Sequence, residues 1–88
     1  MKIKIKKLTA TATIPTKGSE YSAGWDLYAD INSAKIIHSH ETAKISTGLA
    51  MEIPEGYWGG IYARSGLATK NGLRPANCTG VIDSDYRG

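Results

Sequence analysis

The chain has 88 residues and a formal net charge of +3, 41% of its residues are apolar, and it contains no phenylalanine. A chain of this length buries only about 60 to 65% of the surface that its unfolded form exposes, so we expect one small domain with a thin core, to which self-association would add burial. The one cysteine excludes an internal disulfide, and the lack of a long apolar run excludes a transmembrane helix and a signal peptide, so we expect a cytoplasmic protein.

The first predicted element is a basic strand, because lysines alternate with isoleucines from Lys2 to Lys6. Lysines on one face of a strand protect a sheet edge from pairing with another chain. A cluster of positive charge also suits nucleic acid, whose phosphates attract it. We prefer the edge strand and expect neither a nucleic-acid partner nor a membrane.

Segment 23–29 (Ala-Gly-Trp-Asp-Leu-Tyr-Ala) predicts a strand that carries one acidic residue among apolar ones. A carboxylate is costly to bury without a partner, so Asp26 should meet an arginine, a backbone donor or a hydrated cation. Mg²⁺ is the usual companion of phosphate chains and is the cation that this position suggests. A structural salt bridge is the alternative, and the spacing does not separate the two.

Alternation with a period of two is clearest from residue 45 to residue 53 and predicts a half-buried strand. The residues of its inward face would be Ile45, Thr47, Leu49, Met51 and Ile53. Clusters of turn-forming residues separate the predicted strands, at 17–19, 30–33, 38–40 and 54–56. This spacing is typical of a meander or barrel, so we predict an all-β fold. The pair Gly59-Gly60 indicates a bulge or a close backbone approach, and His38 and His40 are interpreted as solvated turn residues.

Segment 63–68 (Ala-Arg-Ser-Gly-Leu-Ala) predicts the end of a strand followed by a short helix. Ser65 would be its N-cap, and the pair Asn71-Gly72 would end it in a left-handed conformation. The first backbone N–H groups of the helix, the Ser65 hydroxyl and the guanidinium of Arg64 together form a plausible phosphate cradle, which Gly66 lets an anion approach closely. An ordinary capped turn with a surface arginine is the alternative.

Segment 77–88 predicts a hairpin tip followed by a strand that carries acidic residues. Backbone groups at the tip could contact a flat base, and Cys78 is interpreted as a small buried residue rather than a nucleophile. On a strand Asp83 and Asp85 would point to one face and repel each other unless a cation or a substrate group lay between them. The ring of Tyr86 is broad enough to lie under a sugar. A solvated acidic edge and a core tyrosine are the alternatives.

Taken in this order, segments 23–29, 63–68 and 77–88 resemble the first three sequence motifs of the trimeric deoxyuridine triphosphate nucleotidohydrolases, the dUTPases. The resemblance spans the whole chain. It implies an all-β, dUTPase-like distorted barrel or jelly roll with one short helical turn, and active sites between the subunits of a homotrimer. It also implies hydrolysis of dUTP to dUMP and pyrophosphate, with Mg²⁺ as cofactor.

The resemblance also implies a role for each candidate residue. Asp83 would position and activate the attacking water, Tyr86 would stack beneath the deoxyribose, and Asp26 would help to organise the hydrated Mg²⁺. The other residues would bind the substrate, its triphosphate through Arg64, Ser65 and Gly66 and its uracil through Asn77 and the main chain of Gly80, Val81 and Ile82.

The dUTPase family continues past the third motif with further strands, a fourth motif and a Gly-rich, Arg-bearing fifth motif that closes over the phosphates. We therefore expect residues 1–88 to form a single dUTPase-like domain without these C-terminal motifs, which hydrolyses dUTP poorly or not at all. Two other readings stay open. One is a noncatalytic dUTPase-like fragment or regulatory binding module, and the other is a dCTP deaminase-like enzyme, against which the ending Asp-Ser-Asp-Tyr-Arg-Gly argues.

Overall fold

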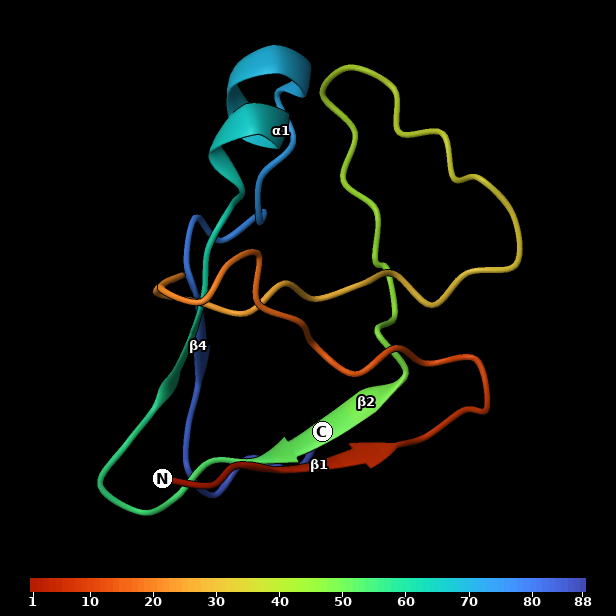
Figure 1. Cartoon of the computed structure of the whole chain (residues 1–88). Coiled ribbons are helices and arrows are strands. Elements are labelled where there is room, and N and C mark those ends of the chain that lie inside the picture. Colours follow the sequence, from red (N-terminus) through yellow and green to blue (C-terminus); the bar gives the residue numbers. More distant parts are fainter. The chain divides into compact units, whose positions relative to one another are not determined.

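The structure is a computed structural model that describes residues 1–88 (Figure 1). Its elements in chain order are β1 (Lys4–Lys7), β2 (Leu49–Glu52), β3 (Gly59–Ile61), α1 (Ser65–Asn71) and β4 (Gly80–Ile82). The chain divides into two compact units, which we call unit 1 (residues 1–4 and 52–88) and unit 2 (residues 5–51). The mostly β architecture with one short helix is the predicted one. No helix of the structure is long and apolar enough to cross a membrane.

The strands form two ribbons of two strands each, β1 with β2 and β3 with β4. In the antiparallel ladder of β3 and β4, Gly59 lies opposite Ile82, Gly60 opposite Val81 and Ile61 opposite Gly80. This ladder is regular across Gly59-Gly60, so the predicted alternative of a bulge is wrong and that of a close backbone approach holds. A Cβ atom added at Gly59 would lie 3.2 Å from Cβ of Ile82.

The predicted alternation from residue 45 to residue 53 appears in the burial of the side chains. Leu49 and Ile53 are buried, Ile45 and Thr47 are half-buried, and the polar positions between them are exposed, as at Ser46. The regular strand is shorter than the pattern, because Gly48 has φ of 68° and interrupts the extended conformation directly before β2. Side-chain burial therefore follows the sequence pattern over a longer stretch than the backbone ladder does.

The core is thin, as the chain length predicts. Its buried side chains are those of Ala12, Pro15, Leu49 and Ile53, and no polar side chain is buried. Large side chains in unit 1 stay open to solvent, and the exposed fractions of Trp58 and Tyr62 are 56% and 66%. Polar contacts at the surface must therefore fix much of the chain path.

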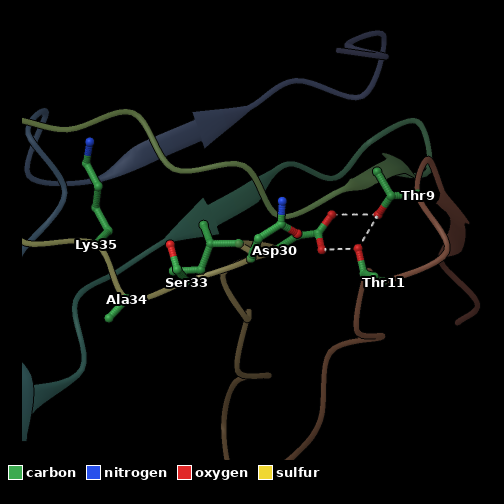
Figure 2. A pocket seen from close by; sticks show the side chains of 8 residues that line it. Thr9, Thr11, Asp30, Ser33, Ala34 and Lys35 are labelled. Carbon is green, nitrogen blue, oxygen red and sulfur yellow. Dashed lines mark hydrogen bonds between the residues drawn. The ribbon is translucent and has the colours of Figure 1, made fainter.

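A polar junction in unit 2 joins three loops around the carboxylate of Asp30 (Figure 2). The hydroxyls of Thr9 and Thr11 donate to its two oxygens at 2.5 and 2.6 Å, and its backbone N–H donates to the Ser46 carbonyl at 2.8 Å. Gly48 packs against the same group, since a Cβ atom there would lie 2.5 Å from Oδ2 of Asp30 and 2.8 Å from Oγ1 of Thr9.

Segment 23–29 is not the strand that its sequence predicts. It contains one isolated bridge, between Thr16 and Asp26, and otherwise runs without regular structure. The reason is that its backbone pairs with segment 14–18 only at this bridge, so no ladder forms on either side of it. The turn that joins the two segments contains a hydrogen bond from the N–H of Ser22 to the carbonyl of Ser19 at 3.2 Å. The predicted turns at 38–40 and 54–56 form, with hydrogen bonds from the N–H of Glu41 to the His38 carbonyl at 3.0 Å and from the N–H of Tyr57 to the Pro54 carbonyl at 3.1 Å. Segment 30–33 contains only a bend, and both histidines are exposed.

Replacing Gly48 with alanine should lower the free energy of unfolding by at least about 2 kcal/mol, because the new methyl group combines a left-handed φ with a collision against Asp30 and Thr9. The control is Gly56→Ala, which has φ of 88° but nothing within 4 Å of the new Cβ atom. It should lose only about 1 kcal/mol of backbone strain. Urea unfolding of the two variants measures the difference, and equal losses would contradict the packing role of Gly48.

Acid should weaken unit 2 through Asp30. The hydrogen bonds from Thr11 and Thr9 lower the pKa of the Asp30 carboxyl, with a smaller contribution from the charge of Lys7, while its desolvation opposes them. A carboxyl whose pKa is lower in the folded state stabilises the fold above its unfolded value of about 3.9, and this stability is lost as the pH falls through the folded pKa. Asp30→Asn should therefore flatten the fall in thermal stability below about pH 4. Asp85→Asn, at an exposed position of unit 1, controls for net charge, and an unchanged acid profile of Asp30→Asn would refute the assignment.

Candidate functional site

The predicted phosphate-binding residues lie where β3 leads into α1. Arg64 is the N-cap, with an extended backbone (φ −85°, ψ 131°), and its carbonyl accepts the N–H of Ala68 at 2.9 Å. Ser65 is thus the first residue of the helix, and the prediction that Ser65 caps it is wrong, because the chain leaves the extended conformation one residue earlier. No side chain caps this helix end, and residues 64–66 are exposed.

The other end of α1 is as predicted. Gly72 has φ of 67° and follows the last helical residue, Asn71. Its N–H donates to the carbonyl of Ala68 at 3.0 Å, and the N–H of Leu73 donates to that of Leu67 at 3.2 Å. These bonds satisfy the last carbonyls of the helix and turn the chain back toward β4.

The predicted hairpin tip forms a tight turn before β4. The N–H of Cys78 donates to the carbonyl of Pro75 at 3.0 Å, and that of Thr79 donates to the carbonyl of Asn77 at 2.7 Å. Cys78 has φ of 66° and is exposed, so the prediction of a buried cysteine is wrong. Its sulfur accepts a hydrogen bond from Nη1 of Arg74 at 3.4 Å. Only the second arm of the predicted hairpin is a strand, and it pairs with β3.

The acidic residues follow β4 in a turn and not on a strand. β4 ends at Ile82, and the N–H of Tyr86 donates to the carbonyl of Asp83 at 3.1 Å. The argument that Asp83 and Asp85 share a strand face therefore does not apply. Both carboxylates are exposed, as is Tyr86, whose phenol lies against the backbone of Gly88.

Arg87 holds this turn in place, a role that the sequence analysis did not assign. Its Nη1 donates to the carbonyls of Ser84 at 2.7 Å and Tyr86 at 2.9 Å, and its Nη2 lies 3.6 Å from Oε1 of Glu52. A guanidinium offers several donors in a fixed plane, so one side chain can bridge two carbonyls and a carboxylate. The sequence signal that could have suggested this role is an arginine directly after the segment that contains Asp83 and Asp85.

The register of β3 and β4 separates the candidate residues into two groups. Arg64 and the turn that contains Asn77 lie at the end where Ile61 pairs with Gly80, while Asp83 and its turn follow the opposite end. Arg64 and Asp83 therefore follow opposite ends of the ladder. Figure 1 shows α1 at one end of this ribbon and the C-terminal residues at the other.

Asp26 belongs to unit 2, where it is half-buried. Its backbone forms both hydrogen bonds of the bridge with Thr16, at 2.7 and 3.3 Å, and its Oδ2 approaches Gly18. No group of three or more histidine, cysteine, aspartate or glutamate side chains in the structure is placed to hold a metal ion. The chain therefore offers Asp26 as one oxygen donor and not as part of a complete metal cage.

A hollow in unit 2 contains none of the predicted site residues. It is lined by Thr9, Thr11, Asp30 and residues 31–35, and Figure 2 shows the junction around Asp30 at its wall. Both oxygens of that carboxylate already accept hydroxyl donors, so the hollow belongs to the scaffold of unit 2.

Comparison with known proteins gives one consistent answer. The sequence model of the dUTPase family matches residues 10–88. The chain is 48% identical over 91 residues to the deoxyuridine 5'-triphosphate nucleotidohydrolase of Orientia tsutsugamushi strain Ikeda. The alignment includes 100% of this chain and 62% of that relative. The chain thus spans about 60% of the length of the curated relatives that it resembles.

Two solved structures show the same similarity. The dUTPase of Staphylococcus bacteriophage 80alpha, solved with dUpNHpp, superposes with a TM-score of 0.84 at 31% identity over 99% of this chain and 49% of its own. The dUTPase of phage phi11 of S. aureus, in a structure that describes coordination of a structural Mg(II) ion, also has a TM-score of 0.84, at 30% identity over 55% of its length. The predicted fold is confirmed for the part of the fold that the chain covers.

Because Ser65 does not cap α1, Ser65→Ala should change the free energy of unfolding by less than about 0.5 kcal/mol. Removal of a serine N-cap would instead cost about 1 kcal/mol. Gly72→Ala is the matched control in the same helix, and it should lose about 1 kcal/mol because alanine is strained at φ of 67°. Urea unfolding decides, and equal losses in both variants would show that the Ser65 hydroxyl supports the helix.

Proposed function

The chain belongs to the dUTPase family, and we propose on this basis that it hydrolyses dUTP to dUMP and pyrophosphate, a reaction that removes dUTP from the nucleotide pool. The observation that carries the proposal is that the family match over residues 10–88 includes every candidate residue, from Asp26 to Tyr86. The turn that places Asp83 and Tyr86 is an ordered structure, fixed by Arg87, so its residues are available in a defined arrangement.

The proposed reaction needs a base for water and a set of cationic donors for the phosphates. Asp83, exposed at the end of β4, would accept a proton from a water whose oxygen attacks the α-phosphorus. The bond from that phosphorus to the bridging oxygen then breaks, and pyrophosphate leaves. Arg64, with the hydroxyl of Ser65 and the open backbone at Gly66, would hold the triphosphate and offset its growing charge.

Recognition of uracil is proposed for the tip and the free edge of β4. β4 pairs only with β3 in its ribbon, so its other edge presents backbone N–H and C=O groups at Gly80, Val81 and Ile82. The amide of Asn77 adds a side-chain donor and acceptor at the adjacent turn. The ring of Tyr86, with 57% of its surface exposed, would stack beneath the deoxyribose.

The donor set fits Mg²⁺ that arrives with the substrate. Mg²⁺ keeps several waters and takes one or two carboxylates together with phosphate oxygens, whereas a dedicated protein cage is unusual for it. Asp26 supplies one carboxylate of this kind, and it would hold the ion through its water shell. When bound, Mg²⁺ would neutralise phosphate charge and so favour departure of pyrophosphate.

We also propose that each site is shared between protomers of a homotrimer. Within one protomer Arg64 and Asp83 follow opposite ends of the ribbon of β3 and β4, an arrangement that favours a site completed by a neighbouring protomer. The outward face between them is apolar, with Trp58, Tyr62 and Val81 exposed by 56%, 66% and 64%. A face of this kind is typical of a surface that another protein covers.

The 88 residues tested alone should hydrolyse dUTP more slowly than a full-length relative, because their unpaired sheet edges leave the proposed site open to water. Pyrophosphate release from dUTP with Mg²⁺ measures this, and a rate equal to that of the Orientia relative would contradict the expected defect. Ammonia release from dCTP would favour a deaminase-like enzyme. Binding of dUpNHpp without any hydrolysis would favour a noncatalytic module.

Mixing two inactive variants tests the shared site. Arg64→Ala and Asp83→Asn should each lower the rate by about 10² or more. In equal mixtures refolded together, a site keeps both groups when its arginine comes from one variant and its aspartate from the other. Random assembly gives about one half times one half, or about a quarter of the wild-type activity.

The double variant Arg64→Ala/Asp83→Asn, mixed in the same way with either single variant, is the control and should restore nothing. Recovery of about a quarter of the wild-type activity in the mixture of the two single variants supports a site built from two protomers. A mixture that stays as inactive as its components, while light scattering shows mixed assemblies, would place both groups in one protomer.

A further inference from the structure

Segments 14–18 and 24–28 in unit 2 are held side by side by side-chain contacts on both faces. Thr16 bridges Asp26, so the adjoining positions Lys17 and Trp25 also lie opposite each other. On one face Nζ of Lys17 lies 5.7 Å from the centroid of the Trp25 ring, a cation–π contact. On the other face the Thr16 hydroxyl and the phenol of Tyr28 are 2.7 Å apart and share a hydrogen bond.

These contacts are not explained by burial. Trp25 and Tyr28 have 63% and 42% of their surface exposed, so neither fills the core. The backbone ladder contributes only the isolated bridge at Asp26, and beyond it the segment has no regular structure. The side chains that flank Asp26 therefore add to its own bonds in holding it against Thr16.

The turn that joins segments 14–18 and 24–28 has hydrogen bonds of its own. Nζ of Lys17 donates to the carbonyl of Glu20 at 2.9 Å, and the N–H of Ser19 donates to Oγ of Ser22 at 2.8 Å. Lys17 thus joins the turn to the Trp25 ring with one ammonium group. The two segments on either side of the bridge are therefore joined by a turn with its own hydrogen bonds.

We infer that Tyr28 and Lys17 are positioning residues that hold Asp26 in place for the magnesium-bound triphosphate. The inference rests on the proposed function only for the role of Asp26. Without the phenol or the ammonium group, Asp26 keeps its carboxylate and its backbone bonds to Thr16, but the two segments lose a side-chain contact that holds them together. Single exposed contacts of these kinds change an equilibrium by about three- to tenfold, and this sets the size of the expected effect.

The first experiment compares binding of dUpNHpp with and without Mg²⁺. Tyr28→Phe and Lys17→Met should lower the factor by which Mg²⁺ tightens binding by about three- to tenfold, while binding without Mg²⁺ stays as in the wild type. Thr16→Ser and Lys17→Arg keep the hydroxyl and the cation, so both should behave as wild type. Tyr21→Phe removes a phenol from a ring that is 90% exposed in the neighbouring turn, and it should change nothing.

The second experiment needs neither metal nor nucleotide. Hydrogen exchange of the Asp26 amide, which donates to the Thr16 carbonyl at 2.7 Å, should speed up by about three- to tenfold in Tyr28→Phe and Lys17→Met and not in the controls. Unchanged exchange would overturn the inference. Equal weakening of binding with and without Mg²⁺ would also overturn it, since that result describes a general structural role.

The two readouts separate failure of this inference from failure of the proposed function. A wild-type chain that binds no dUpNHpp would refute the nucleotide site. The exchange measurement then still decides whether Tyr28 and Lys17 fix Asp26.

Discussion

The pairing of β3 with β4 in one register determines which candidate residues lie together. In this ladder each glycine faces a branched side chain, Gly59 opposite Ile82 and Gly80 opposite Ile61. A Cβ atom at either glycine would come within 3.2 or 3.1 Å of Cβ of the facing isoleucine, so the small residues are needed for the strands to approach. A shift by two positions would bring the two isoleucines together and leave a glycine without a packing partner. Alternating small and large residues thus specify the register of a very short ribbon.

The same register gives the ribbon one inward and one outward face. Gly59, Ile61, Gly80 and Ile82 are half-buried, whereas Gly60 and Val81 are exposed. The rings of Trp58 and Tyr62 lean over Gly60, where a Cβ atom would lie 3.1 Å and 2.8 Å from them. Glycine at position 60 therefore allows an aromatic surface to form between the two ends of the proposed site. In the proposed assembly this surface and the separation of Arg64 from Asp83 have one explanation, since both require a neighbouring protomer.

Local sequence signals predicted the features that depend on few neighbours. The alternation around Leu49, the left-handed Gly72, the turns and the thin core need only a residue's own conformational preference or the chain length. Strand lengths, the first residue of α1 and the exposure of Cys78 depend on tertiary partners, and these predictions were wrong or too long. Segment 23–29 shows the reason: its strand-like composition needs a continuous partner, and the facing segment pairs with it at one position only.

The candidate site divides in the same way. Its residues were chosen by resemblance to the dUTPases, and the family comparison shows that the chain belongs to that family. Their division between two ends of the ribbon follows from a register that periodicity does not encode. Arg87 was missed because its partners are backbone carbonyls and Glu52, and a sequence does not show which carbonyls a turn exposes.

The two units use a common device, in which one polar side chain fixes a turn from outside. Arg87 bridges the carbonyls beside Asp83, Thr9 and Thr11 hold Asp30, and Tyr28 reaches Thr16 beside Asp26. With so little buried apolar surface, such contacts replace packing as the means of fixing loops. Each is open to water, where a hydrogen bond contributes only about 0.5 to 1.5 kcal/mol. Covering them in an assembly would lower the local dielectric and strengthen every one of them. Where the proposed trimer covers such a contact, it would do more than bring Arg64 to Asp83: it would also stiffen a turn that carries a candidate catalytic group, which would couple assembly to catalysis.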